Sequence, residues 1–336
     1  MKVLVIGLGS MGKRRIRNLF ANNIHDITGF DLRTDRISEA SNLYNIKVSS
    51  SLDEIIKGEK FDCWIISVPP DLHHIYVKLA IDFQVPCFVE ASVVDDEMDK
   101  LIIRSDSEKI FVAPSCTLLF HPAIKKIREI LQSEMLGTIS NVTYISGQYL
   151  PDWHLYESPS EYYVSNPLTG GAREIVPFEL TWITNLFGFP IHVAGINKKT
   201  INIEGAEQID DTYNLLMDYS GFTFSLNVDV VSRFATRRLL INGSNMQLYW
   251  EWNDNNIQIF DPNESKWKII SYDLIDAESG YNKNISEQMY NEEIKAFLDR
   301  VRLNVEYPNS LQNDLKILKL LYSAEESFKY KRFVEL

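Results

Sequence analysis

The stretch VLVIGLGSMGKRR, residues 3–15, decides the fold of this 336-residue chain. Its apolar start is typical of a buried strand, and the glycines that follow have the spacing GxGxxG at the beginning of a helical pattern. In such a turn the first glycine permits the tight bend, the second lets the backbone approach a pyrophosphate, and the third allows close helix packing. The N–H groups at the start of the helix then hold the anion. The stretch predicts a dinucleotide-binding loop made of Gly7, Gly9, Ser10, Met11 and Gly12.

An acidic residue, Asp31, follows the next strand-like run, about twenty residues after the glycines. A carboxylate at this position binds the hydroxyls of the adenine ribose and repels a 2′-phosphate, which favours NAD as the cofactor. Arg33 lies two positions later and can capture that phosphate. We therefore expect NAD, with NADP still possible.

The first third of the chain alternates between strand-like runs (2–6, 26–31, 61–68, 86–90 and 109–115) and helical patterns (12–20 and 73–83). Such alternation predicts an α/β domain with a parallel, doubly wound sheet. The pattern changes near Phe120. We expect a dinucleotide-binding Rossmann domain over residues 1–120 and a substrate-binding and oligomerisation domain over residues 121–336.

Longer runs of alternating polar and apolar residues dominate the second part (138–148, 212–220, 222–231, 246–253, 256–261 and 266–273). They are separated by turn signals and by helical patterns over 171–187, 286–302 and 311–329. These features predict an α+β domain with a large, mostly antiparallel open sheet. Helices would cover one face and leave the other for a partner subunit.

Composition restricts the partners. Thirty-four basic and 46 acidic residues give a formal net charge of -12, which disfavours nucleic acid and anionic lipid. The basic cluster Lys13, Arg14, Arg15 and Arg17 is better explained by a bound phosphate or a solvated helix face. The three cysteines are far apart and no metal-ligand spacing occurs, so we expect a reducing cytoplasm and no metal. No run is long enough to span a membrane.

Several motifs carry a resemblance to the glucose-fructose oxidoreductase and inositol dehydrogenase (Gfo/Idh/MocA) family over nearly the whole chain. They are GLGSMGKRR at the start, SVPPDLHH after a strand, CFVEAS, GTISNV, and GGAREIVPFELTWITNLFG. The segment GQYLPDWHLYESPSEYY resembles the Trp-His loop of members linked to surface-sugar biosynthesis. The resemblance implies an NAD(P)-dependent oxidoreductase of a sugar, polyol or nucleotide sugar, assembled as a homodimer or homotetramer.

The resemblance also implies site residues. Glu90 matches the glutamate of the family's Glu-Lys-Pro motif, but Ala91 stands at the lysine and Ser92 at the proline. Phe178 and Thr181 stand where the family commonly has a catalytic histidine and an aspartate. The turn after the third strand-like run adds Ser67, Pro69 and His73 to the expected cofactor residues, although His73 is equally compatible with an exposed histidine.

The missing lysine and histidine need a replacement, because alcohol oxidation requires a group that takes the hydroxyl proton. We expect His154 or Glu179 in this catalytic role, with Glu90 beside the cofactor. A locally bonded surface histidine is the alternative for His154, and a solvated helix flank is the alternative for Glu179.

We expect the substrate to contact Trp153, Tyr163, Arg173 and Glu174. The aromatic stretch to which the first two belong also includes Tyr149, Tyr156 and Tyr162, and it suits either carbohydrate stacking or a subunit interface. The loss of three catalytic groups keeps two other functions open. One is a catalytically inactive, dinucleotide-binding regulatory or structural protein, and the other is elimination or epimerisation through transient oxidation.

Overall fold

The computed structural model describes residues 1–154, 157–273 and 286–336, which form two compact units. The first unit comprises Met1–Thr117 and Tyr290–Leu315, and the second comprises Leu118–Met289 and Lys316–Leu336. The segment Tyr290–Leu315 thus belongs with the N-terminal part of the chain. The expected domains, residues 1–120 and 121–336, did not include this second crossing of the chain into the first unit.

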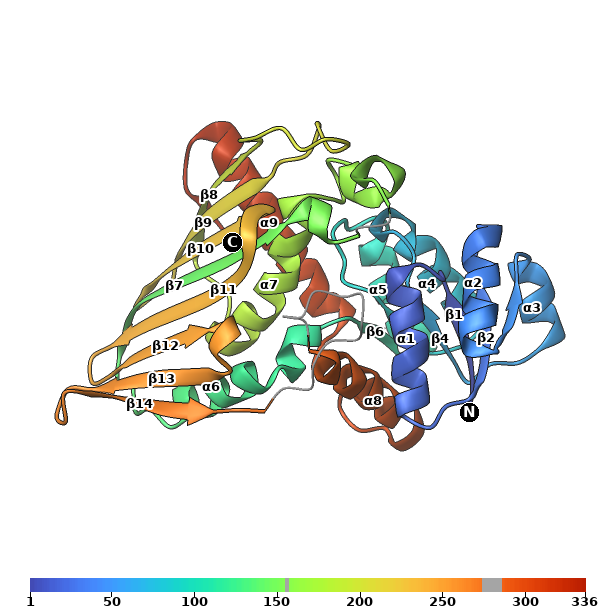
Figure 1. Ribbon diagram of the computed structural model, residues 1–336, viewed down its shortest axis with the longest axis horizontal. Helices are drawn as coiled ribbons and strands as arrows, with labels where there is room; N and C mark the ends of the chain where they lie inside the picture. Colours follow the sequence, from blue (N-terminus) through green and yellow to red (C-terminus); the bar gives the residue numbers. More distant parts are fainter. Residues whose placement is uncertain (155–156, 274–285) are drawn as a thin grey trace. The chain divides into compact units, whose positions relative to one another are not determined.

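The first unit is a doubly wound parallel sheet. Within its described residues the strand order is β3-β2-β1-β4-β5-β6, and every pair is parallel. The strands are β1 (Lys2–Ile6), β2 (Asp26–Phe30), β3 (Lys47–Ser49), β4 (Cys63–Ile66), β5 (Cys87–Val89) and β6 (Val112–Pro114). The helices are α1 (Ser10–Ala21), α2 (Thr34–Tyr44), α3 (Leu52–Gly58), α4 (His73–Asp82), α5 (Met98–Glu108) and most of α8 (Glu287–Leu303). Figure 1 labels these elements except β3 and β5.

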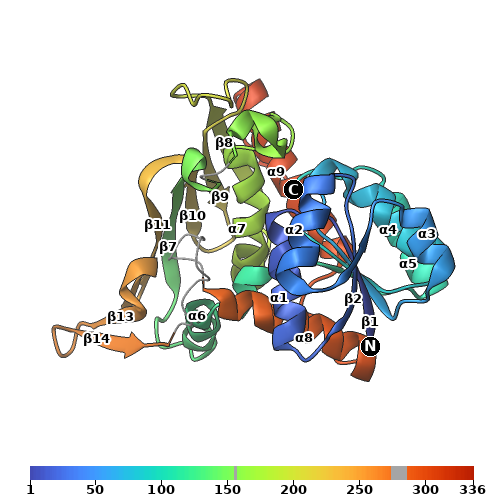
Figure 2. The same ribbon diagram turned by 45° about the vertical axis from the view of Figure 1, so that its right-hand side comes forward.

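Helices cover both faces of this sheet, as Figure 2 shows. On one face, Ile55 of α3, Val77 of α4 and Leu101 of α5 join one apolar cluster with strand residues. On the other face, Phe88 of β5 contacts Phe297 of α8, with 5.9 Å between ring centroids. Strands buried on both faces explain the continuous apolar runs in the sequence, and the predicted α/β doubly wound fold is confirmed.

The second unit is built on a large open sheet. In the part of the chain that the structure describes, its order is β14-β13-β12-β11-β7-β10-β9-β8-β15, and only β10 and β7 pair in parallel. The strands are β7 (Ile139–Tyr149), β8 (His192–Lys198), β9 (Thr212–Asp218), β10 (Thr223–Asp229), β11 (Val231–Gly243), β12 (Gln247–Glu251), β13 (Asn256–Asp261), β14 (Lys266–Ser271) and β15 (Val334–Glu335). The predicted mostly antiparallel sheet is confirmed.

The helices that pack on this sheet include α6 (Pro122–Gln132), α7 (Ala172–Phe187) and α9 (Leu311–Tyr330), which begins in the first unit. Trp182 of α7 contacts Tyr144 of β7 edge to face, with centroids 5.0 Å apart. A Cβ on Gly195 of β8 would overlap the carbonyl of Ala324, so α9 lies directly against β8. In Figure 2 these helices lie on one face of the sheet.

Some elements were not predicted, and their composition explains why. Helix α2 buries only Ala40, so its sequence carries no apolar stripe. The run 222–231 is two strands, because Asp229 accepts hydrogen bonds from the backbone N–H groups of Val231 and Ser232 and turns the chain. None of the helices in the described ranges combines the length and the apolar character needed to cross a membrane.

Candidate functional site

The loop between β1 and α1 is shaped by its glycines. Gly7 has a φ of 91°, and a Cβ there would overlap the carbonyl of Ser67 after β4. A Cβ on Gly12 would overlap the carbonyl of Gly7, so α1 packs directly on the turn. Gly9 precedes α1, and the first turn of that helix contains no acidic side chain. A helix start of this kind fits the pyrophosphate of a dinucleotide.

The Asp31 carboxylate joins this loop to the end of β2. Its Oδ2 accepts a hydrogen bond of 2.7 Å from the backbone N–H of Leu8, and its Oδ1 accepts one of 2.9 Å from the backbone N–H of Arg33. The Asp31 residue is buried. Since a carboxylate oxygen can accept more than one hydrogen bond, these contacts fix the orientation of Asp31 and leave acceptor capacity for ribose hydroxyls.

Two arginines follow Asp31, and the structure separates them. The Arg33 guanidinium binds both oxygens of Asp35, at 3.1 Å and 2.7 Å, and this bond lowers the pKa of Asp35 to about 2. Arg36, which the sequence analysis did not select, lies against the phosphate loop. A Cβ added to Gly9 would stand 3.3 Å from its Nη1.

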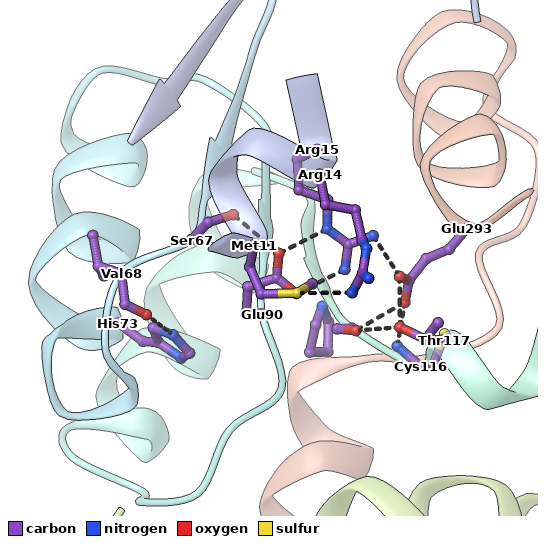
Figure 3. Close-up of polar contacts among 12 residues, drawn as sticks. Met11, Arg14, Arg15, Ser67, Val68, His73, Glu90, Cys116, Thr117 and Glu293 are labelled. Carbon is purple, nitrogen blue, oxygen red and sulfur yellow. Dashed lines mark hydrogen bonds and ion pairs between the residues drawn. The ribbon is translucent and has the colours of Figure 1, made fainter. Parts of the chain in front are cut away.

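Glu90 follows β5 and is held by a buried arginine, as Figure 3 shows. Arg15 of α1 donates from Nε to Oε1 and from Nη2 to Oε2 of Glu90, both at 2.7 Å. Ser67 donates a third hydrogen bond to Oε1, at 3.0 Å. The Arg15 side chain is fully buried, and its guanidinium lies 4.5 Å from the centroid of the Phe88 ring. The expectation that Arg15 binds phosphate or lies on a solvated face is therefore wrong.

Arg15 also contacts a second carboxylate, Glu293 of α8. Its Nη1 lies 2.9 Å from Oε2 of Glu293, which is fully buried. Three further donors surround Glu293: the backbone N–H of Cys116 and the hydroxyls of Ser115 and Thr117, at 2.6–2.9 Å. Burial alone would lower the pKa of Arg15, but the two carboxylates reverse this effect and the pKa is raised.

The other basic residues of the cluster are also engaged. Arg14 is buried, with its guanidinium 4.3 Å from the centroid of the Tyr290 ring. Lys13 forms an ion pair of 2.6 Å with Glu39. The sequence contained a usable signal for Arg15, because a residue three positions after Gly12 lies on the face of α1 that packs on the sheet.

The turn after β4 places Ser67, Pro69 and His73 near one another in the chain, at the carboxyl end of a parallel strand. The Nε2 of His73 lies 3.0 Å from the carbonyl oxygen of Val68, to which it donates. Burial lowers the pKa of His73 to about 4, so the imidazole is neutral at neutral pH. His73 is buried rather than exposed. Pro69 precedes a short 3-10 turn (Pro70–Leu72) that leads into α4.

Glu179 of α7 lies in the interior of the second unit and accepts hydrogen bonds from four side chains. The donors are Tyr144, Ser146, Trp182 and Arg237, at 2.8–2.9 Å, and the Glu179 residue has no exposed surface. The alternative of a solvated helix flank is therefore wrong for Glu179. This carboxylate has the surroundings of a structural acceptor.

The positions of the altered family motifs carry no ionisable group. Thr181 donates to the carbonyl oxygen of Pro177 at 2.8 Å, and Phe178 lies 6.0 Å from the guanidinium of Arg237. Ser92 forms a hydrogen bond with Asp314, whose pKa burial raises to about 7. At position 92, a hydroxyl thus contacts a buried carboxyl group, whose Oδ2 has no hydrogen-bond partner within the described residues.

The residues expected to contact substrate fall on α7 and on the segment before it. The Tyr163 hydroxyl donates to Oε1 of Glu174 at 2.6 Å. The His154 ring lies 4.7 Å from the Tyr162 ring, and its Nδ1 is 3.8 Å from a carboxylate oxygen of Glu157.

Arg173, the neighbour of Glu174, binds Glu325 at 2.7 Å and also donates to the carbonyl oxygen of Leu168. Trp153 is half-buried. Tyr156, from the same aromatic stretch, lies outside the described residues. Over the described ranges, no three His, Cys, Asp or Glu side chains are grouped as a metal site requires.

Comparison with protein families gives two matches. Residues 1–95 match the model described as "Oxidoreductase family, NAD-binding Rossmann fold", and residues 124–249 match the GFO/IDH/MocA C-terminal domain. A comparison with curated protein sequences found no significant match.

Solved structures share the fold over the whole chain. An oxidoreductase from Agrobacterium radiobacter in complex with NAD+, L-tartaric acid and magnesium is 15% identical, with a TM-score of 0.84 over 100% of this chain and 98% of that one. Levoglucosan dehydrogenase with NADH and levoglucosan is 13% identical, with a TM-score of 0.84 and coverage of 100% and 99%. A myo-inositol dehydrogenase from Corynebacterium glutamicum is 16% identical, with a TM-score of 0.76 and coverage of 100% and 98%.

Proposed function

Because the chain belongs to the Gfo/Idh/MocA family of oxidoreductases with an NAD-binding Rossmann domain, we propose that it oxidises or reduces a sugar, polyol or nucleotide sugar. The single observation that carries the cofactor part is the contact between Asp31 and the phosphate loop. Levoglucosan dehydrogenase and myo-inositol dehydrogenase, which share the fold, support the substrate class by analogy.

The residues of the first unit fit a dinucleotide. Gly7 and Gly12 leave no room for side chains, which lets α1 begin directly at the loop, and Asp31 presents acceptors for the ribose. We propose that Ser67, Pro69 and His73 line the same end of the sheet. When bound, the nicotinamide supplies the hydride acceptor or donor. The Asp31 carboxylate repels a 2′-phosphate, so we expect the protein to prefer NAD. Arg36, which lies against Gly9, would attract a 2′-phosphate, so binding of NADP is compatible with the site.

We propose a positioning role for Glu90, because Arg15 and Ser67 already hold its carboxylate. Four side-chain donors hold the Glu179 carboxylate in the same way, and we propose a structural role for it. Of the three residues first proposed as catalytic, His154 retains a candidate role, as a substrate contact beside Tyr162.

The test is a fluorescence titration of the purified protein with NADH and with NADPH, followed by a panel of sugars, polyols and nucleotide sugars assayed in both directions. We expect tighter binding of NADH and turnover of at least one member of the panel. Failure to bind either dinucleotide contradicts the cofactor assignment.

A second function is favoured by the absence of ionisable side chains at Ala91, Phe178 and Thr181. In this alternative the protein binds a dinucleotide without turnover and acts as a regulatory or structural partner. The substitution Ala91→Lys separates the two. Activity that appears only in the variant supports the inactive protein, whereas strong turnover by the unmodified chain contradicts it.

A further inference from the structure

The contact between Tyr163 and Glu174 is a short hydrogen bond at the beginning of α7. The Tyr163 hydroxyl donates to Oε1 of Glu174 at 2.6 Å. The other carboxyl oxygen, Oε2, is shielded from solvent and has no hydrogen-bond partner within the described residues. An ionised carboxylate that is shielded from water needs several hydrogen-bond donors or a nearby cation. A single hydroxyl donor is therefore too few for the ionised form of Glu174.

No cation among the described residues compensates Glu174. The adjacent Arg173 directs its guanidinium to Glu325 and to the carbonyl oxygen of Leu168. Burial therefore dominates and raises the pKa of Glu174 to about 8, while the hydrogen bond from Tyr163 acts in the opposite direction. A group with this pKa gains and loses a proton close to neutral pH, which is the property that general acid–base catalysis requires.

The position of Glu174 on α7 connects it to the altered motif. Glu174 and Phe178 are four residues apart in one helix, so their side chains lie on the same face, one turn from each other. Phe178 stands where the family commonly has its catalytic histidine. The ionisable side chain of Glu174 thus lies one helical turn before Phe178, the position at which the family's histidine is absent.

We propose that Tyr163 and Glu174 together form the proton carrier of this oxidoreductase. The inference rests on the proposed function and deepens it. Oxidation of an alcohol releases one hydride, which the nicotinamide accepts, and one proton. The substrate O–H bond breaks as a new O–H bond forms at Tyr163, while the Tyr163 proton passes to the Glu174 carboxylate. In the reducing direction the same proton returns from Glu174 through Tyr163 to the carbonyl oxygen.

The surroundings of Tyr163 suit a sugar alcohol. Its ring contacts the Tyr162 ring edge to face, with centroids 6.0 Å apart, and Tyr162 in turn contacts the His154 ring. Aromatic faces of this kind stack on the apolar side of a sugar ring and leave its hydroxyls to polar groups at the edge. His154 is then a substrate-orienting residue rather than the proton carrier.

The test uses Glu174→Gln and Tyr163→Phe, with Glu326→Gln as the matched control. The amide at position 174 still accepts the hydrogen bond from Tyr163 but takes no proton, so its shape is conserved. We expect kcat to fall by about 100-fold or more in each variant, with KM changed less than about threefold. NADH affinity should be unchanged, and the control, an exposed carboxylate of α9 paired with Arg332, should retain full activity. Activity of Glu174→Gln within about threefold of the unmodified protein overturns the proposal.

A measurement without turnover separates this proposal from the proposed function. The Glu174 carboxyl carbon, identified by its loss in Glu174→Gln, is titrated by carbon-13 NMR in protein labelled at glutamate. A midpoint close to about 8 supports the proton carrier, and a midpoint in the ordinary range near about 4.3 overturns it. A raised midpoint in a protein that binds NADH but turns over nothing on the panel contradicts the proposed function instead.

Discussion

Two partly buried glutamates, Glu90 in the first unit and Glu174 in the second, differ in what surrounds their carboxyl groups. Glu90 receives two hydrogen bonds from a buried guanidinium and a third from Ser67. Within the described ranges, Glu174 receives one hydrogen bond, from Tyr163. The first environment surrounds the carboxyl group with donors, whereas burial in the second favours the neutral acid. Polar clusters whose hydrogen bonds are all formed stabilise a fold. A carboxyl group with few donors and a pKa close to the working pH is available for proton transfer.

The largest effect is expected from removing the cation that holds Glu90. Arg15→Met leaves the carboxylates of Glu90 and Glu293 without their shared cation. We expect a loss of about 3–5 kcal/mol in the free energy of unfolding, because an uncompensated buried charge is costly. Urea unfolding followed by fluorescence and circular dichroism measures it.

Arg33→Met is the control for Arg15, because Arg33 is an exposed residue paired with an exposed Asp35 and should change stability by less than about 1 kcal/mol. A loss of that small size for Arg15→Met would show that the cluster does not stabilise the first unit. The triple variant with Glu90→Gln and Glu293→Gln should recover part of the stability.

Glu179 extends the comparison to a carboxylate with four donors in the second unit. Glu179→Ala removes the common acceptor of Tyr144, Ser146, Trp182 and Arg237. We expect a loss of about 2–4 kcal/mol in unfolding free energy, measured in the same way. If the variant kept its stability but lost turnover, Glu179 would belong to the catalytic groups after all.

The pH dependence of stability distinguishes Glu174 from the satisfied carboxylates. Its pKa in the folded protein, about 8, exceeds the value of an unfolded glutamate, about 4.3. The folded state therefore binds the proton more tightly, and this stabilisation is present at low pH and is lost as pH rises from about 4.3 to about 8.

In Glu174→Gln, the decrease in unfolding free energy between pH 6.5 and pH 8.5 should be smaller by about 2 kcal/mol than in the unmodified protein. Part of the decrease should remain, because burial also raises the pKa of Asp314 to about 7 and the pKa of Glu293. Glu326→Gln should follow the unmodified protein. Identical pH profiles for Glu174→Gln and the unmodified protein would show that Glu174 ionises in the ordinary range.

The sequence predicted both sheets and the phosphate loop, because their signals are local. The spacing of Gly7, Gly9 and Gly12 and the alternation of strand residues are visible within a few positions. The partners of Arg15 were not predictable, because Glu90 and Glu293 are 75 and 278 positions further along the chain. Residue type alone likewise could not separate Glu174 from Glu179, since both are glutamates of one helix and only their donors distinguish them.

The smallest expected effect concerns two cations that follow Asp31. Arg33 is bound to Asp35, whereas Arg36 lies against Gly9 of the phosphate loop. If a position against the phosphate loop decides which cation meets a 2′-phosphate, Arg36→Ala should weaken NADPH binding about fivefold, or about 1 kcal/mol, and Arg33→Ala should change it less. NADH affinity should change less than NADPH affinity in Arg36→Ala, because NADH lacks the 2′-phosphate. Titrations of both variants with both dinucleotides, at one ionic strength, measure the difference. A larger effect of Arg33→Ala would mean that its pairing with Asp35 at the surface is too weak to withhold it from a phosphate, which is the limit expected for an exposed ion pair.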